Sequence, residues 1–285
     1  MRRILAAGLI GATRRWPVAL LLWLVTLLFG MAFGAAAGEW LDLALDASVA
    51  SRTLAWRLDF NLLGDVFVHH RESLSVVTVV GMILGAVYVL LSVWLNAGVV
   101  GAVQDPDVSF TLRQFWWRGM VSYATFVRLW VTVSVLEVTV IAAIWMSVRA
   151  ANRWLAESPS ELSAYYAIAA GLTLGSVALL VLVTAHDHAR IFAVRKRTGA
   201  WQSLRWASWF VVLGDRRSLL VALTLLLAGG AAWLVYQALA HVIPITSAEW
   251  AGVSLLWGQV LMFARALLRV TSFATQTELQ AEMPD

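Results

Sequence analysis

The chain of 285 residues contains no cysteine, and it contains a single lysine, Lys196. Without cysteine, neither disulfides nor thiolate metal and redox sites are available. Charged residues make up only 13% of the chain, whereas 61% is hydrophobic and the mean hydropathy is +0.77. Ordinary soluble domains of this length do not have this composition. The sequence therefore predicts a protein that is surrounded mainly by lipid.

Common catalytic motifs are absent as well. The sequence contains no G-x-x-x-x-G-K-[ST] phosphate loop, no H-E-x-x-H zinc pair and no G-x-S-x-G nucleophile elbow. Lys196 lies in a solvated basic run. We expect no enzyme, no catalytic residue, no resident metal and no cofactor.

Six long apolar runs are present instead. A helix needs about 20 apolar residues to cross about 30 Å of hydrocarbon, because every backbone polar group must be paired within the segment. The sequence therefore predicts an all-α, polytopic helical bundle that forms one transmembrane domain over residues 1–285. Its expected spans are residues 17–38, 74–99, 129–149, 163–185, 218–240 and 247–270.

The arginines predict how the chain is threaded, because basic residues flanking spans are retained on the cytoplasmic side. If the N-terminus is inside, five of the 21 basic residues fall outside: Arg52, Arg57, Arg71, Arg149 and Arg153. We therefore expect a multi-pass protein of the bacterial cytoplasmic membrane with both termini in the cytoplasm. A signal peptide ending near "GAAAG" is the alternative interpretation of the first run, and we expect that segment to be kept.

Basic residues spread along the membrane border also predict the partners. Each gains about 1 kcal/mol near anionic headgroups. Although the pI is near 9.9, anionic lipid is a simpler partner than nucleic acid, and we expect no nucleic-acid binding. Other membrane proteins are further candidate partners.

Amphipathic segments are predicted next to the spans. Three segments, residues 4–23, 112–131 and 204–223, each read as an interfacial elbow helix, then arginine, then a span, which would make three repeated units. In the second, polar residues recur at helical spacing: Thr111, Gln114, Arg118, Ser122 and Thr125. Residues 39–73 are expected to form an extracytoplasmic amphipathic segment. Within it, Asp65 and His69 are four residues apart, but two ligands do not make a metal site.

Small and polar residues share faces on three spans, and such faces usually serve helix packing in lipid. The fourth span carries Gly171 and Gly175. The second span carries Thr78, Gly81, Gly85, Tyr88, Ser92 and Asn96; the sixth carries Ala251, Ser254, Gly258, Met262, Arg265 and Arg269. We interpret these faces as packing seams rather than a substrate path.

Four stretches resemble a known group. They are "LNAGVVGAV", "FTLRQFWWRGMVSYATFVRLW", "AHDHARIFAVRKR" and "RALLRVTSFATQ". Together they resemble a loose family of uncharacterised bacterial six-helix membrane proteins, which is similar to the membrane domain of glycerophosphodiester phosphodiesterases. The resemblance implies the fold, bacterial origin and membrane location, but no activity. Where that group carries Asp-Tyr-Ala-Arg, this chain has Asp187, His188, Ala189 and Arg190.

Glu137 is the one carboxylate deep within a predicted span, about 12 Å from its cytoplasmic end. Intramembrane acids must face protein, where they either fix helix register or line a site. A cytoplasm-facing vestibule would gather it with other polar residues near span ends. The candidate binding residues are Asn96, Glu137, Asp187, His188, Arg190, Gln259 and Arg265. In the structural interpretation, Asp187 pairs with an arginine at the membrane border.

Three functional hypotheses remain open. The first is a non-catalytic membrane subunit or scaffold that contacts lipids and other membrane proteins. The second is a permease-like transporter for a small solute or lipid-like amphiphile. An intramembrane lipid enzyme is the third: "HDHAR" echoes part of the CDP-alcohol phosphotransferase signature, but the aspartates that hold metal there are missing.

Overall fold

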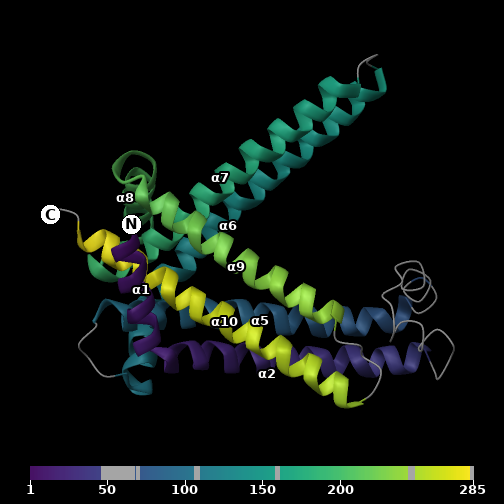
Figure 1. Ribbon diagram of the computed structural model, residues 1–285, viewed down its shortest axis with the longest axis horizontal. Helices are drawn as coiled ribbons and strands as arrows, with labels where there is room; N and C mark the ends of the chain where they lie inside the picture. The colour runs from purple at the N-terminus through teal and green to yellow at the C-terminus, as the bar shows by residue number, and fades with distance from the viewer. Residues whose placement is uncertain (46–67, 69–70, 106–109, 158–160, 243–247, 283–285) are drawn as a thin grey trace. The chain divides into compact units, whose positions relative to one another are not determined.

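The computed structural model describes residues 1–45, 68, 71–105, 110–157, 161–242 and 248–282. Within these ranges the regular elements are all helical and no strand occurs, which confirms the all-α prediction. The helices are α1 (Arg2–Arg14), α2 (Trp16–Leu45), α5 (Arg71–Gln104), α6 (Leu112–Glu157), α7 (Glu161–Arg195), α8 (Ala200–Trp209), the short π-helical turn η1 (Phe210–Gly214), α9 (Arg217–Val242) and α10 (Ala248–Ala281) (Figure 1).

Among the residues that the structure describes, six helices are long and apolar enough to cross a membrane, as predicted. Their apolar segments are Trp16–Leu41, Leu74–Gln104, Leu112–Trp154, Tyr165–Arg195, Arg217–Leu239 and Gly252–Ala281. Several helices continue past the expected span ends, because the amphipathic residues beside the apolar runs also favour helix. The architecture is that of a multi-pass helical membrane protein.

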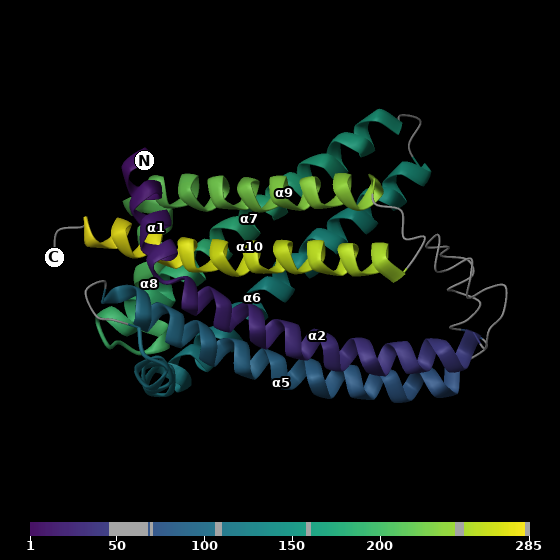
Figure 2. The same cartoon turned by 60° about the horizontal axis from the view of Figure 1, so that its bottom comes forward.

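Helix α6 differs from the predicted elbow followed by a span. It runs through 46 residues without a break. At 1.5 Å per residue it is about 70 Å long, more than twice the hydrocarbon thickness of about 30 Å. Its first turns are seen end-on in Figure 2, while the rest crosses that view, so the expected elbow is the bent beginning of one helix (Figure 2). By contrast, α1 is separated from α2 at Arg15, and α9 starts after a break at Asp215. The threefold repeat stays a prediction.

The chain folds as two compact units. Unit 1 contains Met1–Arg15, Val93–Ala228 and Arg269–Asp285, and unit 2 contains Trp16–Ser92 and Gly229–Leu268. The expectation of a single transmembrane domain stays a prediction. Most of the predicted outer segment lies outside the described residues, including Asp65 and His69; its first residues extend α2 to Leu45.

Unit 1 has a dense core that mixes large apolar side chains with polar ones. Phe115, Phe126, Phe210, Phe273 and Leu129 are fully buried there. So are the side chains of two glutamines and a histidine from α7 and α10: Gln276, Gln280 and His188. Each of these three side chains also has one buried polar atom without a hydrogen-bond partner among the described residues: Oε1 of Gln276, Oε1 of Gln280 and Nε2 of His188.

In unit 1, glycines allow close packing of two stretches that were quoted for the family resemblance, "LNAGVVGAV" and "FTLRQFWWRGMVSYATFVRLW". A Cβ on Gly98 would lie 2.7 Å from the Phe115 ring, and one on Gly101 would lie 2.8 Å from Cβ of Arg118. In the opposite direction, a Cβ on Gly119 would lie 2.7 Å from Nε1 of Trp94. The end of α5 and the start of α6 therefore pack through glycines on both helices.

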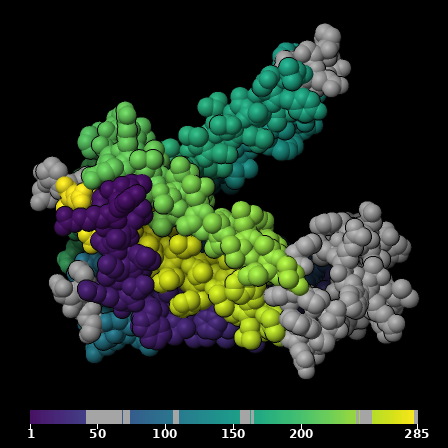
Figure 3. Space-filling view, viewed as in Figure 1, coloured from purple at the N-terminus to yellow at the C-terminus, as the bar shows by residue number. Residues whose placement is uncertain are grey.

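Helices α6 and α7 form a long hairpin within unit 1, and its distal half is a continuous two-helix rod in Figure 3 (Figures 1 and 3). Ile144 packs against Gly175, and Ser147 lies next to Gly171. The predicted seam of the fourth span is therefore a packing contact, as expected. On the outside of the rod, Val138, Trp145 and Leu174 are 65%, 59% and 71% exposed, which suits contact with lipid tails.

Unit 2 uses the predicted face of the second span in the same way. The Tyr88 hydroxyl lies 3.3 Å from the Thr26 hydroxyl, and the Tyr88 ring is 5.3 Å from that of Phe29. Phe33 covers Gly81, where a Cβ would lie 2.9 Å from the ring. Helices α2 and α5 consequently run side by side in this unit (Figure 2).

Candidate functional site

Asp187 is at the centre of the polar core of unit 1. Its Oδ1 accepts a hydrogen bond from Nη1 of Arg190 at 3.0 Å, one turn later on α7. Arg269 of α10 binds both carboxylate oxygens, with Nη1 2.8 Å from Oδ2 and Nη2 2.9 Å from Oδ1. Asp187 and Arg190 are only 5% and 6% exposed. The expected pairing of Asp187 with an arginine is confirmed, and two arginines take part. We call these three residues the Asp187 cluster.

Arg269 extends the cluster to a third helix. Its Nε lies 3.4 Å from Oδ1 of Asn96 on α5, and its guanidinium carbon lies 4.4 Å from the centre of the Phe273 ring. A two-pronged guanidinium–carboxylate contact fixes orientation as well as distance. The cluster therefore holds the ends of α5, α7 and α10 in one register.

His188 lies beside the cluster but bonds elsewhere. Nε2 of Gln280 on α10 is 2.9 Å from Nδ1 of His188 and 3.2 Å from its backbone oxygen. An amide nitrogen is only a donor, so Nδ1 is the acceptor and the imidazole carries its proton on Nε2. The ring packs edge-on against Phe210 at 4.9 Å. The bonds from Gln280 make His188 part of the packed interface between α7 and α10.

Glu137 is half-buried on α6, where the Arg190 guanidinium is near enough to attract its charge. It makes no hydrogen bond or ion pair with any residue that the structure describes. The predicted vestibule would have placed Glu137 with Asn96, but Oδ1 of Asn96 lies 3.4 Å from Nε of Arg269. Glu137 therefore lies within electrostatic range of Arg190 without being held by the cluster.

The remaining predicted site residues lie in unit 2. Gln259 accepts a hydrogen bond from Nε1 of Trp23 at 3.2 Å, and Arg265 is exposed. Four of the seven candidates, namely Asn96, Asp187, His188 and Arg190, meet at the Asp187 cluster or next to it. Arg269 and Gln280 were not among the predicted binding residues. Arg269 had been placed on a packing face, one turn beyond Arg265, and that spacing was the available signal.

Arginines also bind the carbonyl groups at helix ends. Arg15 donates from Nη1 to the Val103 oxygen at 3.1 Å and from Nη2 to the Asp105 backbone oxygen at 2.6 Å. Arg118 donates to the Gly101 oxygen, and Arg195 to the Gln280 oxygen at 2.7 Å. The last carbonyls of a helix have no partner within it and carry partial negative charge. These arginines therefore seal the C-terminal ends of α5 and α10.

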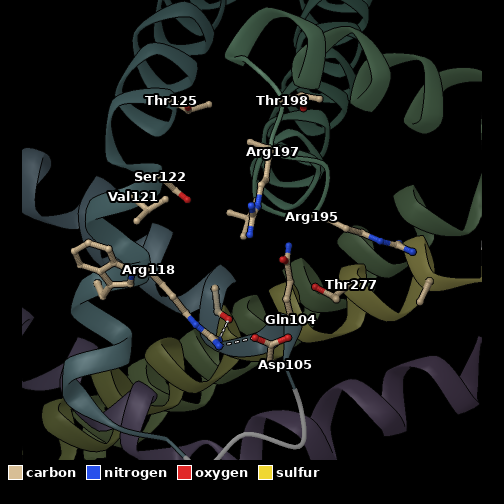
Figure 4. Close-up of a pocket in the computed structure, with 15 residues that line it drawn as sticks. Gln104, Asp105, Arg118, Val121, Ser122, Thr125, Arg195, Arg197, Thr198 and Thr277 are labelled. Atoms are coloured by element: carbon tan, nitrogen blue, oxygen red, sulfur yellow. Dashed lines mark hydrogen bonds and ion pairs between the residues drawn. The ribbon is translucent and has the colours of Figure 1, made fainter.

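A cleft of about 980 Å³ opens in unit 1 where α5, α7 and α10 end and α6 begins (Figure 4). Among the described residues that line it are Gln104, Asp105, Arg118, Ser122, Thr125, Arg195, Arg197, Thr198 and Thr277. In Figure 4, Arg197 and Ser122 point toward the middle of the cleft, whereas Arg118 turns to Asp105 and Arg195 leads away. The sequence placed Arg118, Ser122 and Thr125 on one polar stripe but did not indicate a cleft.

Comparison of the chain with protein-family models, with curated proteins and with solved structures finds no match. The resemblance to the six-helix bacterial group therefore stays a prediction.

Metal chemistry has little support among the described residues. They contain no group of three or more histidine and acidic side chains that is placed to hold a metal ion. The Asp187 carboxylate has both oxygens bonded to arginine, so a cation would have to displace two guanidinium groups. The chemistry that this arrangement favours is structural ion pairing.

Proposed function

We propose that this protein is a non-catalytic subunit or scaffold of the bacterial cytoplasmic membrane, where it contacts lipids and other membrane proteins. The observation that carries the proposal is the bonding of Asp187. Both of its oxygens are bound by arginines, and the residue is 5% exposed. A charge held in this way favours one helix arrangement, and the carboxylate oxygens are already occupied by guanidinium groups.

The outer surface of the α6–α7 hairpin supports the same proposal. Its exposed side chains are apolar over many residues of both helices, so its surroundings must be lipid tails or the helices of another protein. No polar residue described on that distal half forms an ion pair across the hairpin. This surface suits contact rather than chemistry.

A permease is the second candidate, and Glu137 is the observation that favours it. A half-buried carboxylate without a hydrogen-bond partner, next to a buried arginine, is a group that a cation or proton would occupy in a carrier. In that case the Asp187 cluster would have to open during transport.

Flux measurements separate the two candidates. The purified protein is reconstituted in proteoliposomes loaded with a pH-sensitive dye and, separately, with a panel of radiolabelled small solutes. The scaffold proposal expects fluxes equal to those of empty liposomes for wild type and for Glu137→Gln. Flux in wild type that Glu137→Gln abolishes, at equal reconstituted protein, would replace the scaffold by the permease.

Topology can be tested independently of flux. The proposal places both termini and the Arg195–Arg197 segment in the cytoplasm, because the basic residues concentrate there. Single cysteines introduced at Thr13 and Thr198, in a chain that has no native cysteine, should react with a membrane-impermeant maleimide only after cells are opened. Labelling of Thr198→Cys in intact cells would contradict this orientation.

A further inference from the structure

The cleft of Figure 4 carries an excess of positive charge. Among the described residues, Arg118, Arg195 and Arg197 line it together with a single acid, Asp105. Asp105 is paired with Arg118, and Arg195 is bonded to the Gln280 carbonyl. Arg197 is different, because its guanidinium makes no hydrogen bond or ion pair within the described chain and points into the cleft. One arginine is therefore available for an anion.

Two hydroxyl groups on the α6 side of the cleft are available too. Hydroxyls on membrane helices usually donate to the carbonyl four residues earlier, and on α6 Thr132, Thr139 and Ser147 do so at 2.9, 2.8 and 2.8 Å. Ser122 and Thr125 are on the same helix, yet their hydroxyls bond to no described residue. Hydroxyl donors beside a guanidinium are typical of sites for phosphate oxygens.

The backbone at Arg197 has an unusual conformation. Its φ is 49°, which is in the left-handed region, and it follows the end of α7. Glycine is the usual residue where a helix ends in this way, because other residues are strained there. An arginine in this position directs a guanidinium into the cleft, which glycine would not supply.

The position and size of the cleft suit a ligand from the membrane border. It lies where three apolar segments, Leu74–Gln104, Tyr165–Arg195 and Gly252–Ala281, reach their ends. Its volume of about 980 Å³ is at the upper end of the range of small-ligand pockets. Apolar side chains, Trp117 and Val121 among them, share the lining with the polar groups. The cleft can therefore hold a charged group and part of an apolar one.

We propose that this cleft binds a phosphate group, either on an anionic lipid or on a free phosphate, through Arg197 with Ser122 and Thr125. The planar guanidinium offers two parallel N–H donors to two phosphate oxygens, and the hydroxyls donate to the third. This goes beyond the scaffold proposal, because the binding neither needs nor produces transport.

Binding is tested on the full-length protein in a neutral detergent at constant ionic strength, by isothermal titration calorimetry. The probes are short-chain phosphatidic acid, inorganic phosphate and, as a zwitterionic comparison, short-chain phosphatidylcholine. We expect Arg197→Gln to weaken binding of the phosphate probe about tenfold, the loss of a charge-assisted contact. The double substitution of Ser122 and Thr125 by alanine should weaken it several-fold.

Matched variants show whether a loss of binding comes from the site itself, from the lower net charge or from misfolding. Arg113→Gln removes the same charge from an exposed position on α6 outside the cleft lining and should leave binding unchanged. Arg197→Gly removes the guanidinium but relieves the left-handed strain, so it should lose binding about tenfold with a melting temperature equal to or above that of wild type.

The two anionic probes identify the source of the phosphate. Tighter binding of phosphatidic acid than of inorganic phosphate, with both reduced by Arg197→Gln, indicates a lipid, and equal binding indicates a free phosphate. The proposal is overturned if wild type binds neither anion, if Arg197→Gln and Arg197→Gly both bind like wild type, or if Arg113→Gln loses as much affinity as Arg197→Gln. None of these results bears on the flux measurement that tests the scaffold.

Discussion

Arg190 and Arg197 are seven residues apart at the end of one helix, yet their surroundings are opposite. Arg190 is 6% exposed and bound to Asp187, whereas Arg197 is exposed in an open cleft without a partner. Where an acid lies within reach, the arginine becomes part of the packing. Where no described acid pairs with it, as at Arg197, the cation is available to a group outside the chain. The difference shows that the basic residues near the end of the fourth span divide into a buried, paired part and an exposed part, and we assign the proposed binding to the exposed part.

The largest expected effect comes from removing an arginine from the buried Asp187 cluster. Arg269→Leu leaves the Asp187 carboxylate buried with one partner instead of two, and removing one member of a buried pair is strongly destabilising. We expect a loss of about 3 kcal/mol in the free energy of unfolding, measured in detergent by tryptophan fluorescence.

A matched control and a rescue sharpen this test. Arg265→Leu removes an exposed arginine one turn earlier on α10 and should change stability little. Replacing all three members of the cluster by apolar residues of similar size should recover much of the lost stability, because no unpaired charge remains. If Arg269→Leu and Arg265→Leu behave alike, the cluster does not stabilise the fold.

A smaller loss is expected from an arginine that is bonded to carbonyls rather than to an acid. Arg15 is 9% exposed and binds the end of α5, while its neighbour Arg14 is exposed. Arg15→Gln should cost about 2 kcal/mol, because buried carbonyls lose charged donors. Arg14→Gln, with the same change in charge, should be close to neutral. Equal melting temperatures for the two variants would show that Arg15 is not needed at the helix end.

The next largest effect is expected at the contact between α1 and α10, which supports the polar core. A Cβ on Gly8 would lie 2.9 Å from Cα of Thr275, which the backbone of α10 cannot easily avoid, whereas a Cβ on Gly11 would meet Ala274 at an ordinary 3.7 Å. Gly8→Ala should therefore destabilise unit 1 by about 1 to 2 kcal/mol. Gly11→Ala should be neutral or slightly stabilising, because alanine favours helix. Thermal unfolding of both variants decides whether α1 and α10 pack this closely.

The smallest effect is a dependence on pH near the start of α9. Burial alone would raise the pKa of Asp215, but hydrogen bonds from the side chain and backbone of Arg217 lower that pKa below its ordinary value of 3.8. Because the folded pKa is the lower one, this contribution to stability is complete above about pH 4 and is lost as the pH falls through the folded value. Melting temperatures of wild type and Asp215→Asn should differ at neutral pH and converge in acid. A constant difference down to low pH would contradict this.

The fold could be predicted from the sequence because its main signals are local. Runs of about 20 apolar residues, such as residues 17–38, predict spanning helices without knowledge of their neighbours. The glycine seam at Gly171 and Gly175 was likewise visible from spacing. What the sequence does not show is that the elbow before the third span is continuous with it, because an amphipathic helix and an apolar one differ in composition and not in backbone.

The candidate site could be predicted only in part. Asp187 was expected to find an arginine, but Arg265 and Arg269 are one turn apart on the same face, and only the relative depth of α7 and α10 decides that Arg269 meets it. Similarly, Ser122 and Thr125 belong to a polar stripe that an interfacial helix would also show. That they line the same cleft as Arg197 depends on how α6 and α7 pack, which the spacing of residues along the chain does not indicate.

The arginines at the helix ends give a physical reason why the chain contains almost no lysine. Arg15, Arg118 and Arg195 each give a span border its positive charge and each donate to helix carbonyls. A lysine would supply the charge, but its ammonium is a compact point charge without the guanidinium's planar fork of donors. Replacing these arginines by lysine would therefore leave insertion into the membrane unaltered while loosening the folded bundle, so topogenesis and tertiary stability are separable in this chain.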